Sequence, residues 1–321
     1  RWGRRAFLPL AVPPAAAAVW AVVNTAAIRD GDSLVERHRW IASLSVDLSF
    51  RADTLTWLMV LVVGGIGAIV LVYCAGYFAD DEPLLGRFAA HLTAFAGAML
   101  GLVTSDDLIM LYLFWELTTV LSYLLIGHTS ELRTSRSAAT QALVVTTAGG
   151  LAMLVGIVLL GEKAGSYQLS TILADPPRGP VVTAAVVLLV VGAVTKSALV
   201  PFHFWLPSAM AAPTPVSAYL HAAAMVKAGI YLVARLAPGF SDTPLWRPLL
   251  LALGGATMLL GGWRALRQHD LKLLLAFGTV SQLGFLTVLV GTGSRDAALA
   301  GVTLVLAHAL FKACLFLVAG I

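Results

Sequence analysis

The sequence contains few charged residues and almost no cysteine. Asp, Glu, Lys and Arg together make up 12% of its 321 residues, whereas soluble domains contain roughly 25%. A soluble protein of this length could not hide so much apolar surface, because 59% of the residues are hydrophobic and the mean hydropathy is +0.87. The composition therefore excludes an ordinary soluble domain and indicates a protein that crosses a membrane several times.

Other absences narrow the function further. The two cysteines, Cys74 and Cys314, lie in apolar runs without a CxxC partner, and we interpret them as buried apolar residues. The net charge of +4 is small and comes without a basic stripe, so we expect no nucleic-acid partner. No metal-ligand cluster, Gly-rich phosphate loop or Ser–His–Asp arrangement is visible in the sequence. We therefore expect no cofactor and find little support for an enzyme of soluble substrates.

Apolar runs of about 20 residues, long enough to span a bilayer, recur along the whole chain. We expect helices because a spanning backbone must satisfy its own hydrogen bonds, and no alternating barrel pattern is present. No linker divides the chain, so residues 1–321 are predicted to form a single all-α membrane domain. The predicted spans are 6–28, 54–78, 87–104, 108–127, 138–160, 181–210, 216–236, 246–264, 271–290 and 297–320.

The first run follows the basic stretch RWGRR and resembles a signal peptide. There is no initiator Met, and nine more apolar runs follow. We therefore interpret residues 6–28 as a membrane helix of a chain whose true start is missing. The basic residues near the span ends divide nine against nine between the two sides, which predicts no orientation.

Four charged residues lie deep inside predicted spans, where a charge costs about 3 kcal/mol on insertion scales. They are Glu116, Lys196, Lys227 and Lys312. Charges at that depth are expected to face the bundle interior and one another. Because intramembrane ionisable groups are usually functional, we interpret them as an ion pathway. A purely structural ion pair between Glu116 and a lysine is the alternative.

Lysine suits a proton pathway better than arginine, because a buried lysine can load and release a proton whereas arginine keeps its charge. A nearby carboxylate would hold the lysine in its charged form. If the carboxylate moved away, burial would favour the neutral form, and the lysine would release its proton. His221 precedes Lys227 by six residues, and His308 and Lys312 share one helix face at i and i+4. Histidine titrates near neutral pH and suits a relay, although a lone helical histidine is also common as a packed polar residue.

A proline interrupts the sixth predicted span. Pro201 lies five residues after Lys196, lacks an N–H and clashes with the turn before it, so we expect the helix to break there. Such a break at membrane depth would give water access to the lysine, and a simple packing kink is the alternative. Hydroxyl and amide side chains that could carry water between the titrating groups are Thr118, Thr119, Ser122, Thr279, Ser281 and Gln282.

Four stretches resemble the antiporter-like subunits shared by Mrp cation/proton antiporters, respiratory complex I and membrane-bound hydrogenases. They are LFWELTTVLSYLLIGH, TKSALVPFHFWLPSAMAAPTPVSAYLHAAAMVKAGIYLVARL, HDLKLLLAFGTVSQLGF and HALFKACLFLVAGI. The segments AAAMVKAG, DDEP and FWELTT look most like the large A subunit of the Mrp antiporters. The resemblance covers nearly the whole chain.

The resemblance implies a fold with a fourteen-helix core, built from two inverted five-helix repeats that each contain one broken helix. This chain would supply about ten of those helices, the second to the eleventh. The first helix, the second broken helix with its lysine, and everything after the eleventh helix are expected to be missing from this fragment. The family also implies that the RWGRR side is cytoplasmic.

The resemblance also assigns roles to individual residues. Glu116 matches the family's glutamate and Lys196 its broken-helix lysine, while Lys227 with His221 matches the central relay. The polar positions of the family's eleventh helix correspond to His308 and Lys312.

The function implied by the resemblance is a proton-translocating subunit of a multisubunit Na⁺ (cation)/H⁺ antiporter. It would work in a hetero-oligomer with other membrane subunits in a bacterial plasma membrane, and carry H⁺ and Na⁺ or another monovalent cation. Two alternatives stay open. One is a proton-pumping membrane subunit of a redox complex, either complex I (NADH:quinone oxidoreductase) or a membrane-bound hydrogenase. The other is a membrane scaffold whose buried charges specify assembly.

Overall fold

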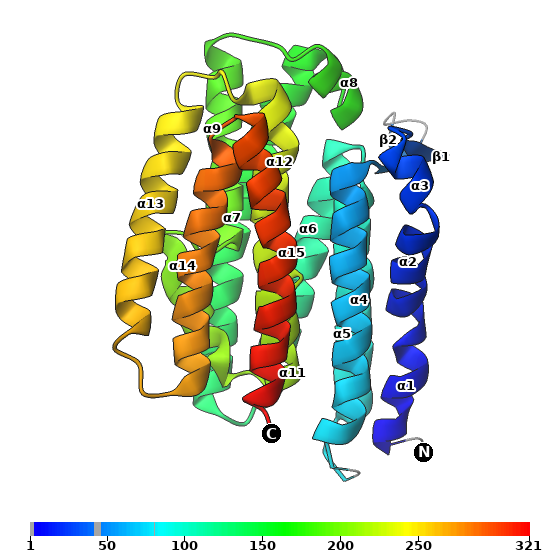
Figure 1. Cartoon of the computed structure of the whole chain (residues 1–321), viewed down its shortest axis with the longest axis vertical. Coiled ribbons are helices and arrows are strands. Elements are labelled where there is room, and N and C mark those ends of the chain that lie inside the picture. The colour runs from blue at the N-terminus through cyan, green and yellow to red at the C-terminus, as the bar shows by residue number, and fades with distance from the viewer. Residues whose placement is uncertain (1–2, 42–45, 80) are drawn as a thin grey trace.

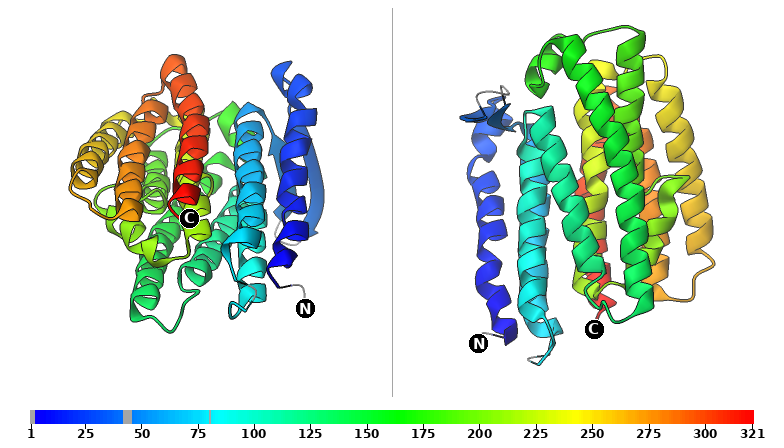
Figure 2. Two further views of the ribbon diagram at one scale, coloured as in Figure 1. Left: turned by 60° about the horizontal axis from the view of Figure 1, so that its bottom comes forward. Right: turned by 180° about the vertical axis from the view of Figure 1, so that it is seen from behind.

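Long helices that run up and down between two ends of a bundle account for nearly all of the protein (Figure 1). The computed structural model describes residues 3–41, 46–79 and 81–321. Both termini lie at one end of the bundle, which we call the terminal end (Figure 1, Figure 2). We call the opposite end, where strands β1 (Leu34–Ile41) and β2 (Val46–Ala52) lie, the hairpin end.

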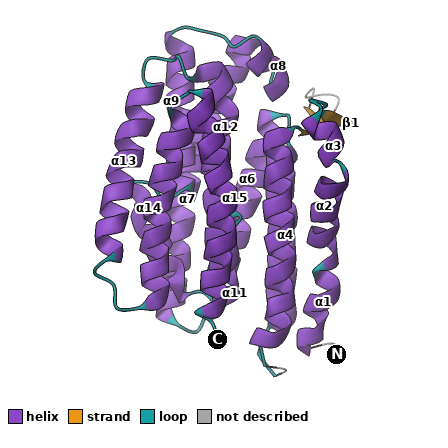
Figure 3. Cartoon of the chain, in the orientation of Figure 1, coloured by secondary structure: helices purple, strands orange, loops and turns teal. Residues whose placement is uncertain are grey.

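Fifteen α-helices are found in the described residues, and Figure 3 shows how little of the chain lies outside them. Three short 3-10 turns occupy Gly3–Ala6, Phe202–Phe204 and Ala209–Ala211. The helices are α1 (Phe7–Leu10), α2 (Val12–Val23), α3 (Thr25–Arg29), α4 (Thr54–Tyr77), α5 (Leu85–Thr104), α6 (Leu108–Ile126), α7 (Arg133–Ala164), α8 (Leu169–Ala174), α9 (Pro180–Lys196), α10 (Trp205–Ser208), α11 (Thr214–Ala222), α12 (Met225–Phe240), α13 (Trp246–Ala265), α14 (Leu271–Gly291) and α15 (Arg295–Val318).

Eight helical segments among the described residues are long and apolar enough to cross a membrane, and each overlaps a predicted span. The other two predicted spans, 181–210 and 246–264, correspond to α9 with its broken continuation and to α13. The prediction of a polytopic helix bundle with a broken membrane helix is therefore confirmed.

The sequence prediction missed a β-hairpin at one end of the bundle. β1 and β2 pair antiparallel, with Leu34 opposite Ala52 and Glu36 opposite Phe50. A signal was present, because apolar and polar residues alternate along VDLSFRA, as is typical of a half-buried strand. A search for 20-residue apolar runs does not detect segments of this length.

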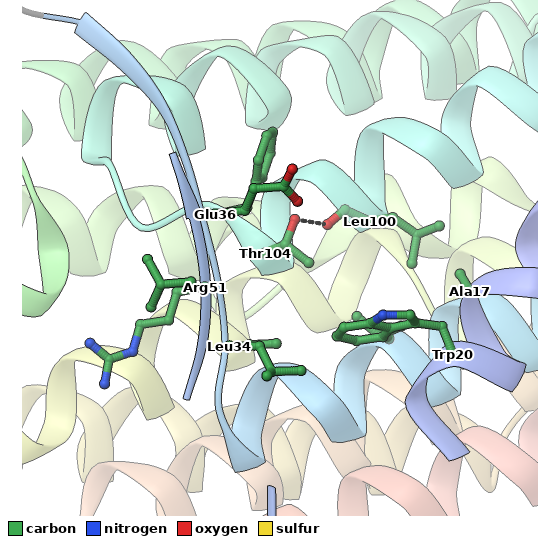
Figure 4. Close-up of a pocket in the computed structure, with 11 residues that line it drawn as sticks. Ala17, Trp20, Leu34, Glu36, Arg51, Leu100 and Thr104 are labelled. Carbon is green, nitrogen blue, oxygen red and sulfur yellow. Dashed lines mark hydrogen bonds between the residues drawn. The ribbon is translucent and has the colours of Figure 1, made fainter. Parts of the chain in front are cut away.

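A cavity of about 570 Å³ lies beside the hairpin, between β1, β2, α2, α4 and α5 (Figure 4). Its lining is mostly apolar and includes Trp20 and Leu34. The hydroxyl of Thr104 donates to the carbonyl of Leu100 at 2.8 Å, and Arg51 extends away from the other labelled side chains in Figure 4. The polar groups here do not converge, so we place the candidate site in the bundle interior instead.

The two cysteines differ in their surroundings. Cys74 is buried as expected, but Cys314 is exposed, which contradicts our interpretation of both as buried residues. Cys314 lies one turn from the exposed side chains of Leu310 and Val318 on α15, so it belongs to the apolar outer face of that helix.

Glycines let several helix pairs approach closely. An added Cβ at Gly156 of α7 would lie 2.7 Å from the carbonyl oxygen of Ala185 on α9. Gly229 of α12 packs in the same way against the carbonyl oxygen of Ala193 on α9. Small residues at such contacts permit the van der Waals packing that associates helices in a membrane.

An ion pair ties the start of α4 to α12. The carboxylate of Asp53 accepts from the N–H of Thr56, which caps α4, and it pairs with the guanidinium of Arg235. Burial alone would raise the pKa of the Asp53 carboxyl. The hydrogen bonds and charge of Arg235 outweigh burial and hold that pKa below its ordinary value.

Replacing Gly229 by Ala is expected to destabilise the bundle, because the new methyl group would clash with a backbone oxygen that cannot move freely. The overpacking should cost about 1–3 kcal/mol. Gly255→Ala on α13 is the matched control, since a Cβ there meets no atom within 4 Å. Both substitutions raise the intrinsic helix propensity by the same amount. If only Gly229→Ala lowers the unfolding temperature, the loss comes from the close packing of α12 on α9.

Asp53→Asn is expected to lower the stability by about 2 kcal/mol at pH 7, since it removes a charged hydrogen-bond partner but keeps a capping side chain. The folded-state pKa is the lower one, so the carboxylate stabilises the fold fully above the ordinary aspartate value of about 3.9. That contribution is lost as the pH falls through the lower, folded-state pKa.

The measurement is the unfolding temperature of wild type and Asp53→Asn between pH 7 and pH 3. The gap between them should stay constant down to about pH 4 and narrow below it. Asp242→Asn is the control, because that side chain is 82% exposed and lies 4.0 Å from Arg247. A gap that widens at low pH would contradict the assigned sign.

Candidate functional site

The helix that carries Lys196 stops at that residue. α9 ends there, and Ala198 takes a left-handed backbone conformation with φ of 51°. We expected the break at Pro201, but it begins about one turn earlier. Pro201 lacks the N–H that would bond the carbonyl of Ser197, and its ring would clash with that carbonyl in a continuous helix, which favours an end of the helix at this point.

Side chains from two other helices bind backbone groups that the break leaves free. The N–H of Val200 donates to Oγ1 of Thr257 on α13 at 2.9 Å. At the far end of the broken segment, Nζ of Lys272 on α14 donates to the carbonyls of Met210 and Ala212, both at 2.9 Å. Because its free polar groups are satisfied in this way, the discontinuity is a fixed part of the fold.

Lys196 is fully buried and its ammonium group binds α6. Nζ donates to the carbonyl of Trp115 at 2.9 Å and to the hydroxyl of Thr119 at 2.6 Å. It also lies 5.2 Å from the centre of the Trp115 ring, within the range of a cation–π interaction. As the last residue of α9, Lys196 is further stabilised by the negative end of the helix dipole. Oxygen acceptors and an aromatic ring therefore surround this charge.

Glu116 does not form the ion pair with Lys196 that we expected; none joins them among the described residues. Its carboxylate packs against Gly150 of α7, and Oε1 is buried without a hydrogen-bond partner in the described part of the chain. The reason is the face that Glu116 occupies on α6. It is half-buried and shares that face with the exposed side chains of Leu113 and Leu117, so it lies at the rim of the bundle.

A second break separates His221 from Lys227. α11 ends and α12 begins within residues 222–225, although the sequence predicted one continuous span. The two breaks touch, because the hydroxyl of Ser197 donates to the carbonyl of Val226 at 2.7 Å. Ser197 follows Lys196 in the chain and Val226 precedes Lys227. The two helices that carry these lysines, α9 and α12, therefore contact each other next to the lysines.

Lys227 and His308 form a hydrogen-bonded pair inside the bundle. Both are fully buried, and Nζ of Lys227 lies 2.6 Å from Nδ1 of His308. A charged lysine can only donate, so Nδ1 is then the acceptor; a neutral lysine has a lone pair that can take a proton from Nδ1. The contact can therefore pass a proton in either direction without a large movement of either side chain.

The other predicted residues of this region lie close to that pair. Lys312 is one turn beyond His308 on α15, and its Nζ donates to the carbonyl of Leu275 at 2.9 Å. His221 is buried with its ring centre 5.4 Å from that of Phe316, one turn beyond Lys312. The side chains of α11, α12 and α15 thus bring four of the predicted residues to one part of the interior.

Five basic side chains are therefore buried in the bundle, and no carboxylate forms an ion pair with any of them among the described residues. They are Lys196, His221, Lys227, His308 and Lys312. Like charges repel strongly where water is excluded, so these groups cannot all carry a proton at once. A proton gained by one group favours release from its neighbour, which is what a relay requires.

The described residues contain no group of three or more His, Cys, Asp or Glu side chains that could hold a metal ion. The buried carboxylate of Asp106 is bound by other side chains at the hairpin end. It accepts from Oγ of Ser170 at 2.6 Å and from Nε2 of Gln168 at 3.1 Å.

Several contacts of the site escaped the sequence analysis. Thr119 was identified only as a hydroxyl that could carry water, but it binds Lys196 directly. Its position on the same helix as Glu116 was an available signal. Ser197 and Thr257 were not identified at all, because their roles depend on where two helix breaks and α13 meet in space.

Two family models match the chain. One, described as "NADH:quinone oxidoreductase/Mrp antiporter, TM", matches residues 105–321 and includes every residue of the candidate site. The other, described as "NADH-Ubiquinone oxidoreductase (complex I), chain 5 N-terminus", matches residues 40–89.

Curated relatives are similar over most of this chain. It is 46% identical over 297 residues to a probable K⁺/H⁺ antiporter A/B subunit of Rhizobium meliloti, covering 92% of this chain and 30% of that protein. It is 43% identical over 299 residues to the large Na⁺/H⁺ antiporter A subunit of Alkalihalophilus pseudofirmus, covering 88% and 37%. The chain thus spans about a third of the length of these relatives.

Two solved structures have the same fold. The Mrp complex from Dietzia sp. DQ12-45-1b contains a chain that matches with a TM-score of 0.90 and 40% identity, covering 98% of this chain and 34% of that one. A chain of the archaeal membrane-bound sulfane sulfur reductase matches with a TM-score of 0.88 and 21% identity, covering 99% and 65%. The expected antiporter-like fold is therefore confirmed.

Thr119→Val is expected to destabilise the protein by about 1–3 kcal/mol, because it removes an acceptor from a buried ammonium group. Thr118→Val is the matched control, since that hydroxyl is also buried but donates only to the Trp115 carbonyl of its own helix at 2.7 Å. Thermal unfolding of the purified protein would compare the two. Equal losses would mean that the hydroxyl of Thr119 contributes nothing to holding Lys196.

Proposed function

Because the chain belongs to the NADH:quinone oxidoreductase/Mrp antiporter transmembrane family, we propose that it is the core of a subunit that moves protons across a membrane in exchange for Na⁺ or another monovalent cation. The names of the relatives support this choice, since they include Na⁺/H⁺ and K⁺/H⁺ antiporter subunits, at 43% and 46% identity. These relatives are longer proteins, so their activity enters here as part of the proposal.

One observation carries the proposal: five basic side chains are buried in the bundle interior, and no carboxylate forms an ion pair with any of them in the described part of the chain. A structural ion pair would be expected to match each buried charge with an opposite one. Here Lys196 is held by a carbonyl and a hydroxyl, and Lys227 by a histidine nitrogen. Groups solvated in this way can lose and regain a proton without leaving an unpaired counter-ion behind.

The placement of these residues suggests an order for the relay. His221 and Lys312 lie toward the terminal end and receive protons there. The contact between Lys227 and His308 passes them on, and the touching helix breaks at Ser197 and Val226 bring that contact next to Lys196.

Glu116 completes the proposed route at the rim of the bundle. The buried Oε1 of its half-buried side chain has no hydrogen-bond partner in the described part of the chain, and a neighbouring membrane subunit at this rim would supply the opposing charge. The protein accordingly works inside a hetero-oligomeric antiporter complex, in the plasma membrane of a bacterium.

A redox-driven proton pump is the second candidate function. The family includes complex I subunits by its description, and the model that matches residues 40–89 is named for complex I. The chemistry of Lys196, Lys227 and His308 would be the same in such a pump. The source of energy would differ, since electron transfer in partner subunits would drive the protons.

Lys196→Ala and Lys227→Ala are each expected to lower cation-driven proton movement about 100-fold, a loss typical of removing a group that transfers a proton. The measurement uses inverted vesicles carrying the intact complex, with a pH-sensitive dye that reports collapse of the pH gradient on addition of Na⁺ or K⁺. Lys163→Ala is the matched control, because that lysine is exposed at the end of α7.

Assembly of each variant is checked by purification of the whole complex. Normal transport by both interior variants would refute the relay. Loss of assembly with normal transport per assembled complex would favour the scaffold interpretation. Acidification driven by electron donors, with no response to cations in wild type, would favour the redox pump.

A further inference from the structure

A second polar feature lies at the hairpin end, outside the proposed relay. A cavity of about 660 Å³ opens between the start of α4, α8, the end of α12, the end of α14 and the start of α15. Its charged lining residues are Asp53, Arg235 and Arg295. Two positive charges therefore face one negative charge.

Arg235 is the more buried of the two arginines that line this cavity. Its side chain is 13% exposed, whereas Arg295 is exposed at the mouth. Lys227, Tyr231 and Arg235 follow one another at i, i+4 and i+8 along α12, so they lie near one face of that helix. At 1.5 Å per residue, Arg235 lies about 12 Å along the axis from Lys227.

Several acceptors fix the guanidinium group at this position. It pairs with the carboxylate of Asp53, and it donates to Oγ1 of Thr56 at 2.6 Å and to the hydroxyl of Tyr231 at 3.3 Å. The hydroxyls of Thr56 and Tyr231 in turn both donate to the carbonyl of Val103 on α5, at 3.0 and 2.8 Å. Three helices thus determine where this charge lies.

A guanidinium group at such a place has two physical consequences. It does not release its proton under ordinary conditions, so it cannot hand a proton from the cavity to Tyr231 or Lys227. Asp53 offsets its charge within the cavity, but together with Arg295 the lining keeps a net positive charge, which disfavours the entry of protons and metal cations. The group acts as a barrier in both respects.

We propose that Arg235 closes the hairpin end of the α12 polar face against protons and cations, so that the relay exchanges protons through the side chains around it and not directly into this cavity. The inference rests on the proposed function and adds a residue to it. A barrier of this kind prevents the ion gradient from leaking through the subunit between transport cycles.

Arg235 could instead be only a tie between α12 and α4. Both interpretations predict that its removal lowers stability. They differ in passive proton permeability, which rises only if the side chain blocks a route.

The test measures proton entry into proteoliposomes that contain the intact complex, with an imposed pH gradient, no Na⁺ or K⁺, and the membrane-permeant cation tetraphenylphosphonium to clamp the membrane potential. Arg235→Ala should raise the passive proton flux about tenfold or more, the rate change expected when one charge repulsion of modest size is removed. Arg235→Lys keeps a positive charge but can release its proton, so it should leak more than wild type and less than Arg235→Ala. Arg295→Ala is the control, since it removes a positive charge from the mouth of the same cavity.

A second substitution shows the route of the leak. The flux through Arg235→Ala should fall back when Lys227→Ala is added, because the leak then lacks its proton carrier. If Arg235→Ala does not assemble, Arg235→Gln takes its place, since its amide can still bond Thr56 and Tyr231 without a charge.

An assembled neutral variant that leaks no more than wild type would overturn the proposal. The proposed function is judged separately in the same vesicles. Its failure would appear as absence of cation-driven proton movement in wild type, and the passive flux would still decide the role of Arg235.

Discussion

The charge of Lys196 has to be stabilised inside the bundle without a carboxylate, and the surrounding structure follows from that requirement. The helix ends at the lysine, so the dipole of α9 favours the ammonium group, and α6 presents a carbonyl, a hydroxyl and an indole ring to it. In a continuous helix the lysine would lie in the helix interior, away from the negative end of the dipole. The proline one turn later favours the early end.

The same break also sets the spacing between the two central lysines. The hydroxyl of Ser197 donates to the carbonyl of Val226, which joins the end of α9 to the start of α12. Gly229 lets α12 pack so closely on α9 that a methyl group at this position would clash. Two helix discontinuities that meet in this way form one structural unit. The backbone next to Lys227 is thus fixed against the backbone next to Lys196.

The sequence predicted the parts of the structure that depend on composition and local pattern. Apolar runs located the spans, depth in those runs singled out Lys196 and Lys227, and Pro201 indicated a break. The absence of an ion pair between Glu116 and Lys196 could not be predicted, because the face that a residue occupies on a helix hydrophobic all round is decided by packing. The break between His221 and Lys227 has no proline or glycine to mark it. The roles of these residues in proton transfer stay predictions.

Thr257 gives the outermost helix a function that its composition does not suggest. Its hydroxyl accepts the free N–H of Val200 and donates to the carbonyl of Leu253 at 2.6 Å, so both of its hydrogen-bonding capacities are used. Elsewhere α13 packs closely on α14 at Gly254 and Gly261, where an added Cβ would clash with backbone atoms. At position 257 serine could replace threonine but valine could not, although valine has the same shape. A helix without any titratable relay residue thus constrains the site through one hydroxyl group.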